Sequence, residues 1–125
     1  MTGIELVTQA MMLLGYTTPT GEADNALNAE QVRRGLPVLR QVLADLLRFK
    51  NPGGELELPA TLNDEVALPD DEAIRVAVPG IAMYLALGAG DNEAYNWYSD
   101  EYTRHRNSIK RSNLRRLDDL PRVGW

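Results

Sequence analysis

Apolar residues recur every three to four positions in four stretches of the chain, a pattern typical of helices that bury one face. The first stretch follows Thr2, which can form a capping box with Glu5, and it stops at Gly15. The second begins near Asn28, a favourable capping residue, and ends before the Asn-Pro-Gly-Gly sequence at 51–54. The segment between these two helices is rich in turn-forming residues and is expected to be a loop.

The third helix is predicted from Pro69 to Gly88 and the fourth from Asp91 to about Leu117. Acidic residues directly after Pro69 suit the positive end of the helix dipole, and Asp91 can cap the fourth helix. One face of the fourth helix is expected to pack on the other helices, and its residues follow helical spacing: Ala94, Trp97, Tyr98, Tyr102, His105 and Ile109.

Two prolines and one change of period complicate this helical pattern. Pro37 and Pro79 lie inside the second and third helices, so each is expected to bend or restart its helix. At about 55–68 apolar and acidic residues alternate, which is compatible with a short two-stranded β-hairpin. The predicted fold class is therefore mainly α: a small four-helix bundle with bent helices. It forms a helical domain at 1–117, followed by an extended C-terminal tail at 118–125.

The composition narrows the chemistry that such a bundle could carry. The 125 residues include no cysteine and one histidine, which excludes disulfides, thiolate metal sites and cysteine nucleophiles. No spacing brings together a nucleophile, a base and an oxyanion donor, or a set of converging metal ligands. We therefore expect no catalytic residues, no metal and no cofactor. No apolar run reaches the roughly 18 residues of a membrane span, so no membrane partner is expected.

The net charge of −5 hides two opposed blocks of charge. Residues 51–101 contain eleven acidic residues and one basic residue, whereas residues 102–125 contain seven basic and two acidic residues. Such blocks can pair within one molecule or between copies, or they can be ordinary solvated faces. The second half of the fourth helix has few apolar residues, so it either projects into solvent or docks on an acidic surface.

Apolar residues also mark the last positions of the sequence. Leu120 and Val123 precede Trp125, where most chains carry polar residues. One interpretation is that Trp125 folds back onto its own core. The other is that this segment docks on another subunit, because aromatic residues are common anchors of interfaces.

The order of these features carries a resemblance to a known family. The features are a first helix ending Leu-Leu-Gly at 13–15, a leucine-striped second helix ending before a Pro-Gly turn, and Leu-Pro-Asp-Asp at 68–71 opening a helix of small residues. A tyrosine-rich helix with a basic end and a closing Leu-Pro tail follow. Over nearly its whole length the chain resembles the bacteriophage head–tail connector proteins, also called adaptor or head-completion proteins.

The resemblance implies a structural virion protein and no enzymatic activity. Such subunits form a homo-oligomeric ring, often of about twelve copies, in which one face meets a different face of the next copy. The ring lies beneath the portal protein at the head–tail junction, extends the DNA channel and receives a downstream tail or stopper protein. Genome double-stranded DNA would pass through it without sequence-specific binding, and the subunit would be made in the host bacterial cytoplasm.

Two sets of residues are expected to form the surfaces of this assembly. The set expected to dock on the portal or on a neighbouring subunit is basic and apolar: Arg104, Arg106, Lys110, Arg111, Arg115, Arg116, Leu120, Arg122, Val123 and Trp125. The set expected to face an adjacent copy or the channel is acidic: Glu55, Glu57, Asp64, Glu65, Asp70 and Asp71. An acidic channel would repel phosphate and let DNA slide.

A different class of function remains open from the sequence alone. The basic end of the fourth helix could contact phosphates, which would make the chain a small helical nucleic-acid-binding or regulatory module. Against this interpretation, the chain as a whole is acidic and shows no helix-turn-helix pattern.

Overall fold

The computed structural model describes the backbone of residues 1–15 and 26–118, and the side chains of residues 1–15 and 33–109. Four long helices make up this part of the chain, which contains no β-strand. They are α1 (Gly3–Leu14), α2 (Ala26–Lys50), a continuous helix made of α3 (Asp70–Glu72), η1 (Ala73–Ala77) and α4 (Val78–Ala89), and α5 (Asn92–Asp118). The predicted mainly α fold is confirmed.

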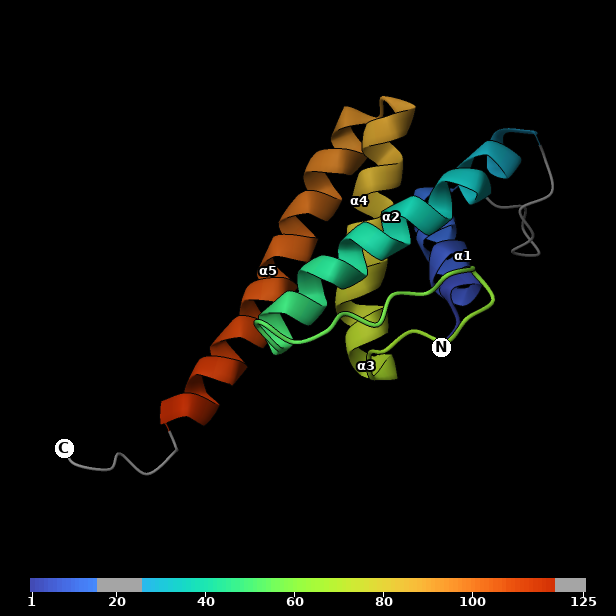
Figure 1. Cartoon of the computed structure of the whole chain (residues 1–125). Coiled ribbons are helices and arrows are strands. Elements are labelled where there is room, and N and C mark those ends of the chain that lie inside the picture. Colours follow the sequence, from blue (N-terminus) through green and yellow to red (C-terminus); the bar gives the residue numbers. More distant parts are fainter. Residues whose placement is uncertain (16–25, 119–125) are drawn as a thin grey trace, which may run out of the picture.

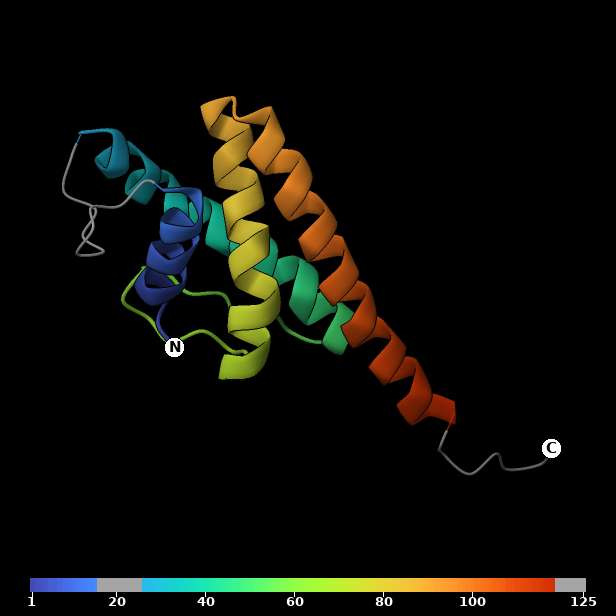
Figure 2. The same cartoon turned by 180° about the vertical axis from the view of Figure 1, so that it is seen from behind.

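Helix α4 is the centre of the bundle, and α1, α2 and α5 all pack against it (Figures 1 and 2). The core between them is formed by fully buried apolar side chains of α1, α2, η1 and α4, to which α5 adds the buried Tyr102 and Ile109. The largest of these side chains are Leu6, Met11, Leu39, Leu43, Leu46, Ile81 and Leu85. Both views also show α5 running beside α4 and then continuing beyond the other helices.

The ends of α1 and α5 are fixed by local capping interactions that the sequence predicts. The Thr2 hydroxyl accepts the backbone N–H of Glu5, and Gly15 closes α1 in the left-handed conformation. At α5, an Asp91 carboxylate oxygen accepts the backbone N–H of Ala94 at 3.1 Å. Helix α5 ends at Asp118, one residue beyond its predicted end near Leu117.

Helix α2 begins at Ala26, before the predicted cap at Asn28. It continues through Pro37 as one helix, so of the two outcomes expected there the restart does not occur. Proline removes the hydrogen bond to the carbonyl of Arg33. Because Arg33 and Pro37 are both exposed, this carbonyl can bond to water while the buried face of α2 holds the helix together.

The second internal proline alters the helix that contains it. The turn before Pro79 widens into the π-helical segment η1, where the backbone N–H of Val78 bonds to the carbonyl of Ala73. Proline cannot donate to the carbonyl four residues back and its ring crowds the preceding turn, so a wider turn accommodates it. The predicted disturbance at Pro79 is therefore a local π segment in a helix that continues from Asp70 to Ala89.

The β-hairpin considered for 55–68 is not formed. This segment is an extended loop. Its alternating apolar and acidic residues place Leu58 against the core and leave Glu55 and Glu57 exposed. Its one β-type contact is an isolated antiparallel bridge between Glu65 and Thr2. The loop therefore packs on helices and on the chain start instead of pairing with itself, as expected for a short ribbon that is unstable alone.

By length and composition, the helix from Asp70 to Ala89 could cross a membrane. More than half of its most apolar window is buried inside the bundle, as in the core helix of a water-soluble domain. Most of its apolar surface thus packs on α1, α2 and α5, whereas Ile74 and Leu87 are exposed.

Candidate functional site

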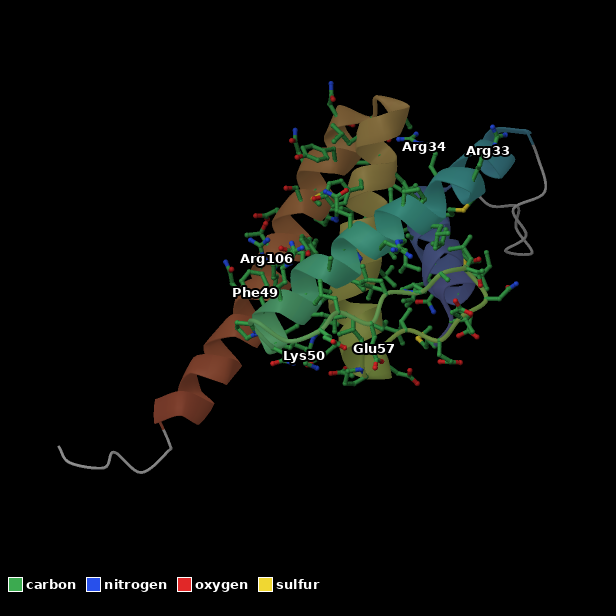
Figure 3. All side chains as sticks on the ribbon, viewed as in Figure 1. Arg33, Arg34, Phe49, Lys50, Glu57 and Arg106 are labelled. Atoms are coloured by element: carbon green, nitrogen blue, oxygen red, sulfur yellow. The ribbon has the colours of Figure 1, made fainter. Side chains whose placement is uncertain are left out.

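The predicted acidic residues form one surface on the loop between α2 and α3 and on the first turn of α3. We call this set the acidic surface: Glu55, Glu57, Asp64, Glu65, Asp70 and Asp71. All six are exposed, and Glu57 is labelled in Figure 3. Within this set, Glu57, Asp64 and Glu65 line one hollow of the loop, and Glu65 and Asp70 meet at the amino group of Met1.

Several carboxylates of the acidic surface already have partners within the chain. The amino group of Met1 lies 2.9 Å from Glu65 and 3.1 Å from Asp70, and hydrogen bonds to these carboxylates raise the pKa of that amino group. Asp71 lies 3.4 Å from Arg75. Glu55 and Glu57 are exposed and take part in none of these ion pairs, so their negative charges are the most available to a partner.

Asp64 has a structural role within this surface. Its carboxylate accepts the backbone N–H groups of Ala60 and Thr61 at 2.9 and 3.0 Å, which closes the turn before the bridge to Thr2. These backbone hydrogen bonds, that of Thr61 first, lower the pKa of Asp64. Asp64 therefore helps to shape the loop, and its contact with a partner stays a prediction.

Two predicted basic residues are resolved in detail, and they differ. Arg104 is exposed and forms an ion pair with Glu101, whose pKa is lowered mainly by that hydrogen bond. Arg106 instead turns toward the bundle, where its guanidinium lies 3.2 Å from Asp45 on α2. Figure 3 shows Arg106 beside Phe49 at the C-terminal end of α2, and its guanidinium stacks on the rings of Phe49 and Tyr102.

Arg106 therefore belongs to a polar network that joins α5 to α2. The Tyr102 hydroxyl donates to the same Asp45 carboxylate oxygen at 2.5 Å. Burial first, and then the hydrogen bond to Asp45, raise the pKa of Tyr102 above its ordinary value. The sequence placed Tyr102 on the packed face of α5, but the partner on α2 could be found only from the fold.

This network predicts a loss of stability in alkali. The unfolded chain ionises Tyr102 near pH 10 whereas the folded chain keeps the proton, so the free energy of unfolding should fall as the pH rises above 10. At pH 11 this one group should account for about 1 kcal/mol. Urea unfolding of the parent chain and of the Tyr102→Phe variant between pH 8 and 11 measures this loss. If the free energy of unfolding depended on pH in the same way in both chains, Tyr102 would not be its cause.

The remaining predicted basic positions of α5 are Lys110, Arg111, Arg115 and Arg116. Their backbone lies on the part of α5 that extends beyond the other helices (Figure 1), and we call this part the basic arm. Leu120, Arg122, Val123 and Trp125 lie outside the described residues. The two interpretations of Trp125 thus both remain predictions.

A feature that the sequence did not predict is an apolar groove between the end of α1 and the start of α5. Its volume is about 480 Å³, and it is lined by Leu13, Leu14, Glu93, Ala94, Trp97 and Tyr98. The Tyr98 hydroxyl donates to the carbonyl of Leu13 at 3.1 Å and so fixes α1 to α5. We call this set of lining residues the Trp97 groove.

The exposure of Trp97 corrects the expected packing of α5. Tyr102 and Ile109 are buried as predicted, but the side chain of Trp97 is 65% exposed. The spacing of apolar residues predicts which face of α5 packs on the bundle, but it does not predict where the neighbouring helices end. Because α1 stops at Leu14, nothing in the described part of the chain covers Trp97.

The described residues contain no group of three or more His, Cys, Asp or Glu side chains placed to hold a metal ion. His105 lies 3.3 Å from Glu101, one turn away on the same helix, and both side chains are partly exposed. This is a surface pair on a helix that also includes Arg104.

Comparison of the chain with protein-family models, with curated proteins and with solved structures finds no significant match in any of the three.

Proposed function

We propose that this chain is a structural subunit of a bacteriophage head–tail junction, which assembles into a ring beneath the portal and extends the channel for DNA. The observation that carries the proposal is the separation of two unlike surfaces. The basic arm of α5 leaves the bundle on one side, whereas the acidic surface lies on the loop before α3 (Figures 1 and 3).

Opposite charges on different elements of a subunit favour contact between one part of a copy and a different part of the next. Such a heterologous contact generates a ring when the rotation between copies closes. Charge complementarity would set the orientation of the copies and speed their encounter. Glu55 and Glu57 are the acidic residues best placed for this contact, because both are exposed and neither is part of the ion pairs at Met1.

Within the ring, carboxylates that remain free would face the channel and keep DNA phosphates at a distance. The portal protein on one side and a tail or stopper protein on the other would complete the junction, which places the mature subunit in the virion. The order of sequence features that resembles head–tail connectors supports this assignment together with the mainly helical bundle.

Light scattering and electron microscopy of the purified chain test self-assembly. Over a series of rising concentrations at low salt, the mass should rise from that of one subunit to a discrete multiple, and the particles should be closed rings. High salt should reverse the assembly, because exposed charge pairs are screened. A single subunit or a strict dimer at every concentration would contradict a ring protein.

The basic arm also supports a second candidate, a nucleic-acid-binding module. In that case the chain should bind duplex DNA with a steep dependence on salt, and binding should be lost when Lys110, Arg111, Arg115 and Arg116 are changed to glutamate. The ring proposal predicts weak binding to DNA with little change in these variants. A titration of labelled duplex DNA at several salt concentrations separates the two.

A further inference from the structure

The Trp97 groove is an apolar surface whose occupant can be argued from the fold. Trp97, Leu13 and the neighbouring Met12 are each half exposed or more, at 65%, 50% and 55%. Large apolar side chains gathered in this way are typical of contact sites. Glu93 lies at the same groove and adds one negative charge.

The chain itself contains a segment with matching chemistry. Residues 119–125 carry the large apolar residues Leu120, Val123 and Trp125, with the acidic Asp119 at the start and the basic Arg122 between the apolar residues. An aromatic anchor with aliphatic neighbours suits an apolar groove. Arg122 would suit Glu93 by charge.

The length of α5 prevents this segment from reaching the groove of its own subunit. Helix α5 continues from Trp97 to Asp118, which is about 32 Å at a rise of 1.5 Å per residue. Residues 119–125 span at most about 24 Å when fully extended. A groove that receives Leu120, Val123 and Trp125 must therefore belong to another copy.

The position of the groove relative to the acidic surface suits such a neighbour. Helix α1 begins beside Glu65 and Asp70, which contact Met1, and it ends at the groove with Leu13 and Leu14. Its 12 residues span about 18 Å. A neighbour whose basic arm ends at the acidic surface could thus extend residues 119–125 along α1 as far as the groove.

We propose that residues 119–125 of one copy dock in the Trp97 groove of the next copy. The inference rests on the proposed function, because it assigns the apolar contact of the same head-to-tail assembly. The acidic surface and the basic arm would orient two copies, and the apolar segment in the groove would hold them together.

Disulfide trapping tests this contact directly, because the chain has no native cysteine. Leu13→Cys and Val123→Cys are made as separate full-length variants and mixed under mild oxidation. The expected product is a disulfide-linked pair containing one copy of each, well above the homodimers. The control replaces Leu13→Cys with Asn107→Cys, which is exposed on α5 ten residues beyond Trp97.

Alanine variants show whether the contact supports assembly. Trp97→Ala and Trp125→Ala should each weaken assembly about tenfold or more in a light-scattering titration, as expected for an aromatic anchor. Ile74→Ala is the matched control, because Ile74 is also exposed, at 48%, but lies at the opposite end of the long helix that includes α4. Circular dichroism would confirm that each variant keeps its helical content.

The outcomes separate this inference from the proposed function. Rings that form normally in both tryptophan variants, without the mixed disulfide, would overturn the docking and leave the ring. The mixed disulfide in small open oligomers would support the docking and count against the ring. If Trp97→Ala weakened assembly and Trp125→Ala did not, the groove would bind something other than residues 119–125, which would overturn the inference.

Discussion

Reversing the charge of either surface is expected to abolish assembly of the chain. Glu55→Lys combined with Glu57→Lys lowers the charge of the acidic surface from −6 to −2 and makes its two least restrained positions positive. Arg115→Glu combined with Arg116→Glu lowers the charge of the four basic positions of the arm from +4 to zero. Each pair of changes removes most of the attraction between neighbouring copies and places like charges opposite one another at the changed positions. Because like charges placed opposite one another cost several kcal/mol, association should weaken about a hundredfold.

Light scattering over a concentration series measures this loss. Asp100→Lys is the control, since Asp100 is an exposed acidic residue of α5 that belongs to neither surface. The folds should be unaffected, because Glu55 and Glu57 are exposed and make none of the contacts that hold the loop. Assembly that persists in both charge-reversal variants would mean that the two surfaces do not meet.

Replacing Gly80 with valine should have the largest effect on the stability of the bundle. A Cβ atom at this position would lie 2.8 Å from the Tyr102 ring and 3.1 Å from Val42. Tyr102 cannot turn away easily, because its hydroxyl is bonded to Asp45. Overpacking of this kind costs about 3 kcal/mol, and the gain of up to about 1 kcal/mol from removing a helical glycine offsets only part of it.

Gly88→Val provides a matched control in the same helix. The three atoms nearest to its Cβ would all belong to the end of the Arg34 side chain, which can move. We therefore expect a change in the free energy of unfolding within about 1 kcal/mol for Gly88→Val and a loss of about 2 kcal/mol or more for Gly80→Val. Urea unfolding followed by circular dichroism measures both. Equal stabilities would contradict the close approach of α4 and α5.

The helices could be predicted from the sequence because their signals are local. Thr2 and Asp91 cap α1 and α5 as expected, and Gly15 ends α1. Where the prediction failed, a tertiary contact outweighed a local preference. Helix α2 continues through Pro37, which lies on its exposed side. The alternating segment at 55–68 packs on helices and does not pair with a second strand.

The candidate surfaces were predictable only in part, for the same reason. A run of acidic residues in the sequence remains a cluster on the loop before α3, so its location followed from the sequence. Whether a charge is free depends on neighbours far along the chain, as Arg106 shows by pairing with Asp45 on α2. The exposure of Trp97 depends on where α1 ends in space, which spacing along α5 cannot reveal.

The most direct test of head-to-tail assembly is to mix the two charge-reversal variants in equal amounts and measure the mass by light scattering. If an acidic surface of one copy meets the basic arm of the next, each variant supplies the partner that the other lacks, because both contacts again join opposite charges. The account predicts that assembly, absent in each variant alone, returns in the mixture as particles with alternating subunits. A mixture that stays at the mass of single subunits, while the parent chain assembles, would contradict it.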